Sequence, residues 1–487
     1  MSAKRAQRLR TAATFTGTCT VALAGLTVAV SAHALDILRA DREISATPAA
    51  AMVPKISDCP HDAPSRPLQL AEAIERTLCA NPKTREAWAD VKAQSAAVGA
   101  ARAAYLPTLS ANFQDVREKS VVNVHGQPTL DEHYTAMVRS GSISLNWLLF
   151  DFGGREAALA NANALLKAAL ATQNATLQSV FAAAAKDYYA AQAAVSARQA
   201  ASDVERMTRA SMAAAQAQAD HGVVPISDAL QAQTQHEEAL YSLAKAQGDA
   251  QTALGVLASD MNLEPDQPLA VPTVTAGSLP AKTFSATVQQ MIKAVKTMHP
   301  AVKAAQAQYA AALAKVVQTR SQGLPSISLV AQDSRNNQPE SAGLGLPTYP
   351  ASGSEAYVGV QVTIPVFEGF SRHYQIAQAR AEAERQQDVL NETVQQVALD
   401  VWSSYHTLGA ATQNVTNSKN LLDIAEEAYE AARQRYDTGV GNILELMSTQ
   451  TALANAKQRR IQALTEWDYA RVDLASKLGQ LNAADIH

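Results

Sequence analysis

The sequence predicts a mainly α-helical fold made of two copies of one unit, in which two β-strands are followed by a long helix and a return helix. Three observations support this prediction. Matching motifs recur at a constant distance, the spacing of apolar residues switches twice from a helical to a strand period, and long Ala-rich stretches flank both switches. Alanine favours helix and buries little area per residue, which favours long, closely spaced helices over a thick globular core.

The duplication rests on motifs that keep one register. Three pairs match: Asn81-Pro82 … Leu106-Pro107 with His299-Pro300 … Leu324-Pro325, Phe150–Arg155 with Phe367–Arg372, and His221–Asp228 with Thr438–Glu445. The distance between copies stays constant to within one residue, and it is far longer than a solenoid period. We therefore expect structural units over 67–263 and 285–481, joined by a Pro-rich linker over 264–284.

The N-terminus has the features of a signal peptide. Basic residues between Lys4 and Arg10 precede a small apolar stretch, and Ala32-His33-Ala34 matches a cleavage site of the A-x-A type. We expect residues 1–34 to be removed, although an uncut signal anchor is the alternative. The mature chain would then begin with an N-terminal extension over 35–66 and end with a short tail over 482–487.

Two cysteines, Cys59 and Cys79, remain after this cleavage. In an exported protein an even pair of cysteines usually forms a disulfide. We therefore predict a Cys59–Cys79 bond that fixes the N-terminal extension to the first helix. The alternative is two buried free thiols.

Each unit is expected to begin with a helix, over about 68–105 and 285–322, that ends before a Leu-Pro pair. The apolar period then changes to two, which is typical of amphipathic strands. Such alternation covers 108–114 with a partner over about 135–149, and 326–332 with a partner over about 357–364. The segments near 117–133 and 335–353 are polar and rich in Gly and Pro, so we expect loops there.

Long helical patterns follow, over about 155–221 and 371–437. At the helical rise of 1.5 Å per residue, each would extend about 100 Å. They stop before Gly222 and Gly439, which are well placed to end a helix in the left-handed conformation. Return helices are expected over about 227–260 and 444–478.

Four amphipathic strands per chain are too few to close a barrel, and lipid does not tolerate open strand edges. Sharing the sheet between chains removes these edges, and a wider barrel accommodates the polar strand faces around an aqueous lumen. We therefore predict an intersubunit membrane β-barrel continued by an α-helical barrel. The alternative is a small sheet packed on the helices of its own chain.

Composition and motifs exclude several classes of function. The net charge of −4 does not suit a nucleic-acid binder, and an apolar fraction of 47% does not suit a disordered chain. His236-Glu237-Glu238 lacks the second histidine of a zinc-binding helix, and we find no phosphate-binding loop or nucleophile elbow. We expect no enzyme activity, no catalytic residue, no metal, no cofactor and no nucleic-acid partner.

With these features the chain resembles the TolC-like outer-membrane channel proteins, over about Leu68 to Leu481. The resemblance is carried by the duplicated unit, by Arg435-Tyr436-Asp437-Thr438-Gly439, and by Ile443–Leu446 followed by Gln450. It implies a homotrimer in the cell outer membrane, in contact with its lipid, with the helical part in the periplasm. It also implies a periplasmic adaptor and an inner-membrane ABC or RND transporter as partners. Cys59-Pro60 and Leu78–Pro82 resemble the subgroup that serves type I protein secretion, including cyclolysin-type toxin export.

The resemblance also implies a site at the helix tips, which close the periplasmic entrance in this family. The pore acids match Asp228 and Glu445, and the latch tyrosine matches Tyr436. The sequence departs from the family at Gly441, where a latch arginine is expected, and at Ser448, where a second pore acid is expected. Simpler roles stay open, because acids in a first helical turn complement the helix dipole, Asn442 with Glu445 matches a capping box, and Tyr436 can be ordinary packing.

We therefore expect a passive export duct without an energy source of its own. Small-molecule or multidrug efflux is the alternative within transport. A periplasmic coiled-coil scaffold or adaptor is the alternative from another class, and it would be recovered as a soluble protein.

Overall fold

The structure is a computed structural model that describes residues 36, 38–50, 52, 59, 64–274, 287–341, 343 and 346–481. The predicted signal peptide, the C-terminal tail and part of the linker lie outside these residues. The N-terminal extension contains η2 (Asp41–Glu43), and the first unit contains α2 (Leu70–Ala80), α3 (Pro82–Ala103), β1 (Thr108–Val122), η3 (Pro128–Leu130), β2 (Glu132–Phe150), α4 (Gly154–Asp220) and α5 (Ile226–Asp260). The second contains α6 (Val288–Met298), α7 (Pro300–Ser321), β3 (Ser326–Asn336), β4 (Glu340–Ser341), β5 (Thr348–Tyr349), β6 (Gly353–Thr363), α8 (Ser371–Asp437) and α9 (Ile443–Lys477).

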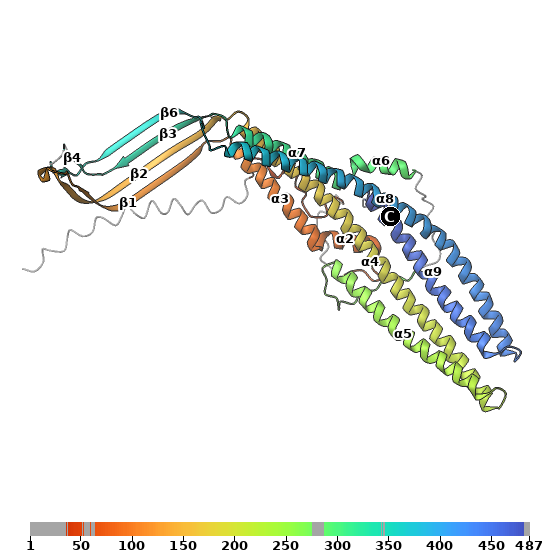
Figure 1. The fold of residues 1–487 in the computed structure, drawn as a ribbon. Helices are drawn as coiled ribbons and strands as arrows, with labels where there is room; N and C mark the ends of the chain where they lie inside the picture. Colours follow the sequence, from red (N-terminus) through yellow and green to blue (C-terminus); the bar gives the residue numbers. More distant parts are fainter. Residues whose placement is uncertain are drawn as a thin grey trace, which may run out of the picture.

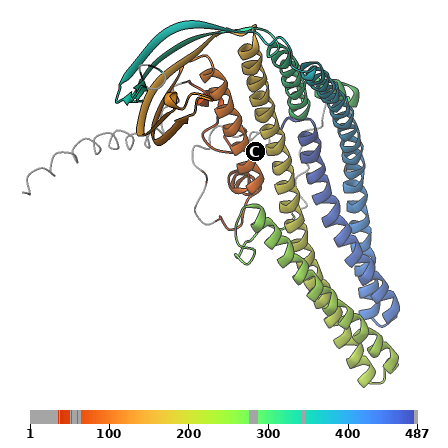
Figure 2. The same ribbon diagram turned by 60° about the vertical axis from the view of Figure 1, so that its left-hand side comes forward.

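The molecule is elongated, with the sheet at one end and the tips of two helical hairpins at the other (Figure 1). The helices α4 and α8 each contain 67 residues, which corresponds to about 100 Å. Figure 2 shows the hairpins α4–α5 and α8–α9 running in the same direction, and α4 also packs on α3, α7 and α9. No helix among the described residues is long and apolar enough to span a membrane.

The long strands form one antiparallel sheet in the order β1-β2-β3-β6, so the strands of the two units meet between β2 and β3. Side chains directly opposite each other in such a sheet lie on the same face. One face, here called the apolar face, carries Leu109, Ala111, Phe113, Ile143, Leu145, Trp147, Leu329, Ala331, Val358, Val360 and Val362. The opposite, polar face carries Ser110, Asn112, Ser142, Ser144, Gln332, Ser334, Tyr357 and Gln361. The predicted alternation is therefore present on all four strands.

The predictions of loops near 117–133 and 335–353 are partly wrong. β1 continues through 117–122, because each of these residues pairs with β2, from Arg117 opposite Met137 to Val122 opposite Glu132. The charged composition ends the apolar pattern there without interrupting the backbone ladder. The segment 335–353 contains the short hairpin β4–β5.

The prediction of single helices over 68–105 and 285–322 is also wrong. Each segment forms two helices, separated by the residue that precedes a proline. Proline disfavours the helical conformation for the preceding residue, and Asn81 and His299 have extended backbones with ψ of 130° and 135°. Both residues then cap the next helix. The Asn81 side chain accepts from the backbone nitrogen of Lys83 at 3.0 Å, and His299 accepts from that of Ala301 at 3.2 Å.

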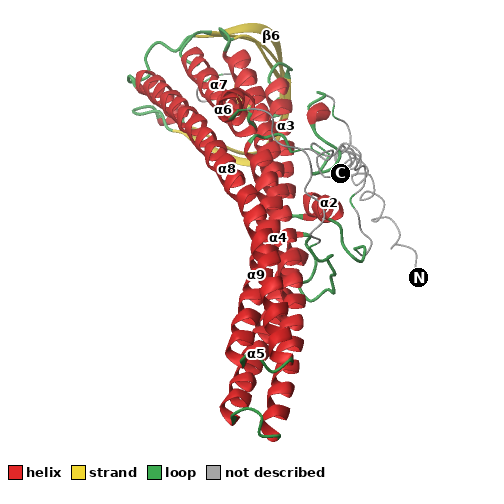
Figure 3. Ribbon diagram, turned by 90° about the vertical axis from the view of Figure 1, so that its right-hand side faces the viewer, coloured by secondary structure: helices red, strands yellow, loops and turns green. Residues whose placement is uncertain are grey.

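The helical core is divided among separate small clusters, as the Ala-rich composition predicts, and the helices taper into a narrow bundle (Figure 3). One cluster joins Leu78 of α2 to Leu177 and Phe181 of α4. The N-terminal extension is fixed beside it by a disulfide between Cys59 and Cys79.

Candidate functional site at the helix tips

Each helical hairpin reverses at a glycine. Gly222 and Gly439 have φ of 71° and 77°, the left-handed region that favours glycine. At the first tip the backbone nitrogen of Val223 donates to the carbonyl of Gln218, and at the second that of Val440 donates to Arg435. These bonds satisfy the last carbonyls of α4 and α8 in the same way. The two tips are thus copies of one turn, and their side chains account for the differences between them.

The second tip has no room for a side chain at Gly441. A Cβ placed there would lie 2.9 Å from the backbone nitrogen of Tyr436 and 3.0 Å from the carbonyl carbon of Arg435. The backbone nitrogen of Gly441 also donates to the Arg435 carbonyl at 2.9 Å. A larger side chain at position 441 would therefore require the backbone of this turn to shift.

Glu445 lies in the first turn of α9, and Asn442 caps that helix. The Asn442 side chain accepts a hydrogen bond of 2.8 Å from the backbone nitrogen of Glu445. The Glu445 carboxylate lies 3.7 Å from the Arg435 guanidinium, across the turn on the end of α8. Half of the capping box is therefore present, while the acid itself pairs across the turn. Both side chains of the pair are about half exposed, so the carboxylate stays accessible to solvent.

Tyr436 is buried at 4% exposure in the cluster that joins the two tips. Burial raises the pKa of the Tyr436 hydroxyl, and the Asp228 carboxylate, on the other hairpin, raises it further, followed by Asp437. The structure thus brings Tyr436 and Asp228 close enough to interact electrostatically. The Tyr436 hydroxyl has no hydrogen-bond partner among the described residues. Asp228 is partly buried and lies in the first turn of α5, whose N-terminus favours a negative charge.

Two polar contacts between the hairpins were not predicted as site features. Gln450 of α9 is 1% exposed and donates to the Ser211 hydroxyl of α4 at 2.7 Å. Nearby, Gln235 of α5 donates to Thr451 of α9 at 3.2 Å. The sequence pointed to only one of these residues, Gln450, through its place in the family motif. The partner residues could not be predicted, because they lie on other helices and depend on how the helices pack. Together these contacts hold the first tip against the second.

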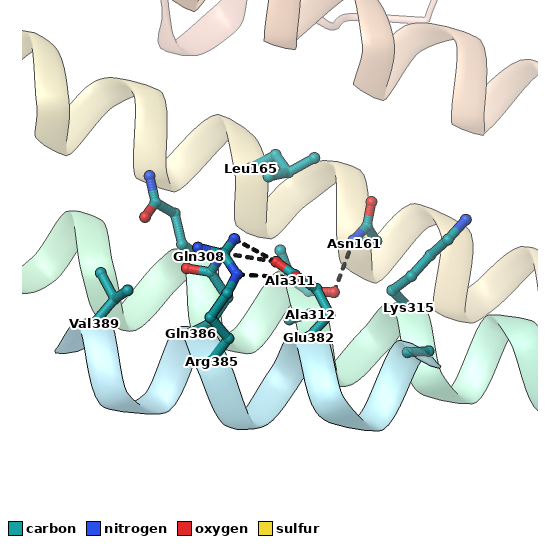
Figure 4. Close-up of a pocket in the computed structure, with 11 residues that line it drawn as sticks. Asn161, Leu165, Gln308, Ala311, Ala312, Lys315, Glu382, Arg385, Gln386 and Val389 are labelled. Carbon is teal, nitrogen blue, oxygen red and sulfur yellow. Dashed lines mark hydrogen bonds and ion pairs between the residues drawn. The ribbon is translucent and has the colours of Figure 1, made fainter. Parts of the chain in front are cut away.

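A pocket lies between α4, α7 and α8, away from the helix tips (Figure 4). Its polar groups are paired internally: Arg385 donates to Glu382 at 3.0 Å, and Asn161 donates to the Ala311 carbonyl at 2.7 Å. The Arg385 and Gln386 hydrogen bonds lower the pKa of Glu382 to about 2. No metal-binding group of three or more His, Cys, Asp or Glu side chains occurs in the described part of the chain. The tips therefore remain the stronger candidate site.

Comparison with known proteins agrees with the duplicated fold. The chain is 32% identical to the protein CyaE of Bordetella pertussis over 424 residues, which cover 86% of this chain and 85% of CyaE. It is 24% identical to the proteases secretion protein PrtF of Dickeya chrysanthemi over 172 residues, which cover 35% of this chain and 36% of PrtF. The outer membrane channel CmeC of Campylobacter jejuni has a similar structure, with a TM-score of 0.72 at 15% identity, over 85% of this chain and 86% of that one.

The sequence pattern of outer membrane efflux proteins matches this chain twice, over residues 73–261 and 291–480. The two matches coincide with the two structural units, each of which supplies two strands and one helical hairpin. The chain belongs to the outer membrane efflux protein family of TolC-like channels, which are transport proteins of the outer membrane and not enzymes.

Proposed function

We propose that three copies of this chain form a passive duct for type I protein secretion. The observation that carries the duct is a sheet with one apolar and one polar face, in which the outer edges of β1 and β6 have no partner strand within the described chain. Lipid does not tolerate such edges, and pairing β1 of one copy with β6 of the next removes them. The polar faces would then line the lumen, and the helices would extend the tunnel through the periplasm.

The type of cargo is inferred from the relatives. PrtF is named as a proteases secretion protein, and the similarity to CyaE extends over most of both chains. Both agree with the cysteine-containing segment, which resembles the subgroup that serves type I secretion. In this proposal the tips dock a periplasmic adaptor and an inner-membrane ABC transporter, which supplies the energy.

We further propose that the tips gate the entrance. The buried Tyr436 beside Asp228 would hold the hairpins together at rest, and the Arg435–Glu445 pair would fix the turn of the second hairpin. Opening then requires the hairpins to separate. Glu445 would present a ring of carboxylates to the entrance, one from each copy.

Deleting the gene from its host tests the duct and its cargo. We expect a protein to disappear from the culture medium and to return on complementation, with unchanged sensitivity to small toxic compounds. Normal protein secretion with increased drug sensitivity would instead support the small-molecule efflux alternative. Images of the detergent-purified particle should show threefold symmetry, whereas a soluble single-copy particle would contradict the barrel.

A further inference from the structure

The apolar face of the sheet changes character at the end farthest from the helices. On β2 the outward positions run from Trp147 through Leu145 and Ile143, and the next charged position is Arg139. From the level of Ile143 outward the same face carries Asp115, Arg117, Lys119, Arg139, Asp333 and Arg335, here called the charged belt. A strand that rises about 3.3 Å per residue places Arg117 roughly 13 Å beyond Phe113. The belt therefore lies where a membrane-seated sheet leaves the hydrocarbon layer.

The charge of the belt is predominantly positive and largely unpaired. Its four basic side chains and two aspartates are all exposed. Arg139 pairs with Asp115 at 3.2 Å. Within the described part of the chain, Arg117, Lys119 and Arg335 have no ion-pair partner. Three cationic groups thus remain available to an external anion.

The opposite face of the same strand ends has the opposite charge. There the polar face carries Glu118, Glu132 and Glu355, and Glu118 lies between the belt residues Arg117 and Lys119 on β1. Tyr134 donates to Glu118 on this face at 3.0 Å. Basic groups on the lipid side and acidic groups on the lumen side are not expected from a merely solvated strand end, which has no reason to separate the signs.

We propose that the charged belt binds the phosphate groups of lipid headgroups at the outward border of the membrane. Guanidinium groups bind phosphate through two parallel hydrogen bonds, and anionic headgroups attract basic side chains that lie within a Debye length of the surface. The belt would fix the height of the sheet in the membrane and recruit anionic lipid around it. The inference rests on the proposed seating of the apolar face in lipid, and it is independent of the cargo.

The test uses the full-length oligomer in phosphatidylcholine vesicles with and without diphosphoryl lipid A. After detergent extraction, mass spectrometry measures the lipid A retained per oligomer. We expect the R117Q/K119Q/R335Q variant to retain several-fold less lipid A than the unmodified chain, and added salt to reduce the difference. The charge-conserving R117K/R335K variant should recover most of the retention.

The matched control is E118Q/E355Q, on the opposite face of the sheet in β1 and β6, which should retain lipid A like the unmodified chain. Equal retention of lipid A by the R117Q/K119Q/R335Q variant would overturn the proposed lipid binding. Heat-resistant oligomers in the vesicles would show that the barrel of this variant still forms. A chain that does not insert into either type of vesicle would contradict both the barrel and the belt.

Discussion

The side-chain amide of Gln450 on α9 donates a hydrogen bond of 2.7 Å to the Ser211 hydroxyl on α4. This bond joins the second structural unit to the first near the helix tips. Gln450 is 1% exposed, and its Oε1 atom has no hydrogen-bond partner among the described residues. Ser211 therefore satisfies the buried amide only in part, which makes this contact sensitive to substitution.

Replacing Ser211 with Ala should destabilise the tip region. The change leaves the buried amide of Gln450 without a partner, which costs about 1–3 kcal/mol. Hydrogen exchange of the α4 and α9 backbone near the tips should increase. The S211A/Q450L double variant should return close to the original exchange, because removing both polar partners leaves no unpaired group. Unchanged exchange in Ser211→Ala would show that the bond contributes nothing.

Replacing Glu445 with Ala should alter ion flow more than stability. The Arg435–Glu445 pair is about half exposed, so its loss costs at most about 1 kcal/mol, and the Asn442 cap does not need the carboxylate. If Glu445 lines the entrance, the cation preference of single channels in planar bilayers should fall.

The control for this measurement is Asn442→Ala. It removes the cap of α9 and should cost about 1 kcal/mol of stability without changing the cation preference. An unchanged current and cation preference in Glu445→Ala would leave only a local role for the acid.

The sequence predicts best those features that depend on neighbouring residues. The ends of α4 and α8 follow from Gly222 and Gly439, because a left-handed glycine stops a helix locally. The full length of β1 does not, because its charged outer half pairs with β2 without an apolar pattern. The Gln450–Ser211 contact joins residues 239 positions apart and depends on the rotation of α9 against α4. The Arg435–Glu445 pair likewise depends on the shape of the turn.

Removing the disulfide should release the N-terminal extension. The bond spans a sequence separation of 20, for which the chain-entropy estimate is about 3 kcal/mol. We expect C59S/C79S to increase cleavage of the extension in limited proteolysis, and reductant to do the same to the unmodified chain. The N-terminal end of the extension is held by contacts that do not depend on the disulfide. Trp88 donates a hydrogen bond to the Ser45 carbonyl, and Arg102 donates one to the Leu38 carbonyl. Equal proteolysis with and without reductant would show that the disulfide does not hold the extension in place.

Asp260, the last residue of α5, should make stability depend on pH. Burial raises its pKa to about 7, and hydrogen bonding and charge repulsion from Asp187 contribute, while Lys83 opposes the shift. Because the folded pKa lies above the unfolded value of 3.8, the folded chain holds more protons between these values. This contribution to stability is complete below pH 3.8 and is lost as pH rises through 7. After allowance for solvent screening of a half-buried group, the loss is about 1–2 kcal/mol.

Asp260→Asn should remove this dependence, because the amide stays neutral at every pH. The difference in thermal unfolding temperature between pH 5 and pH 8 should be smaller in the variant than in the unmodified chain, and the variant should be the more stable of the two at pH 8. Asp249→Asn is the matched control on the same helix, since Asp249 is exposed and pairs with Lys245. Parallel pH profiles for the unmodified chain and Asp260→Asn would show that the Asp187–Asp260 contact does not hold a proton near neutral pH.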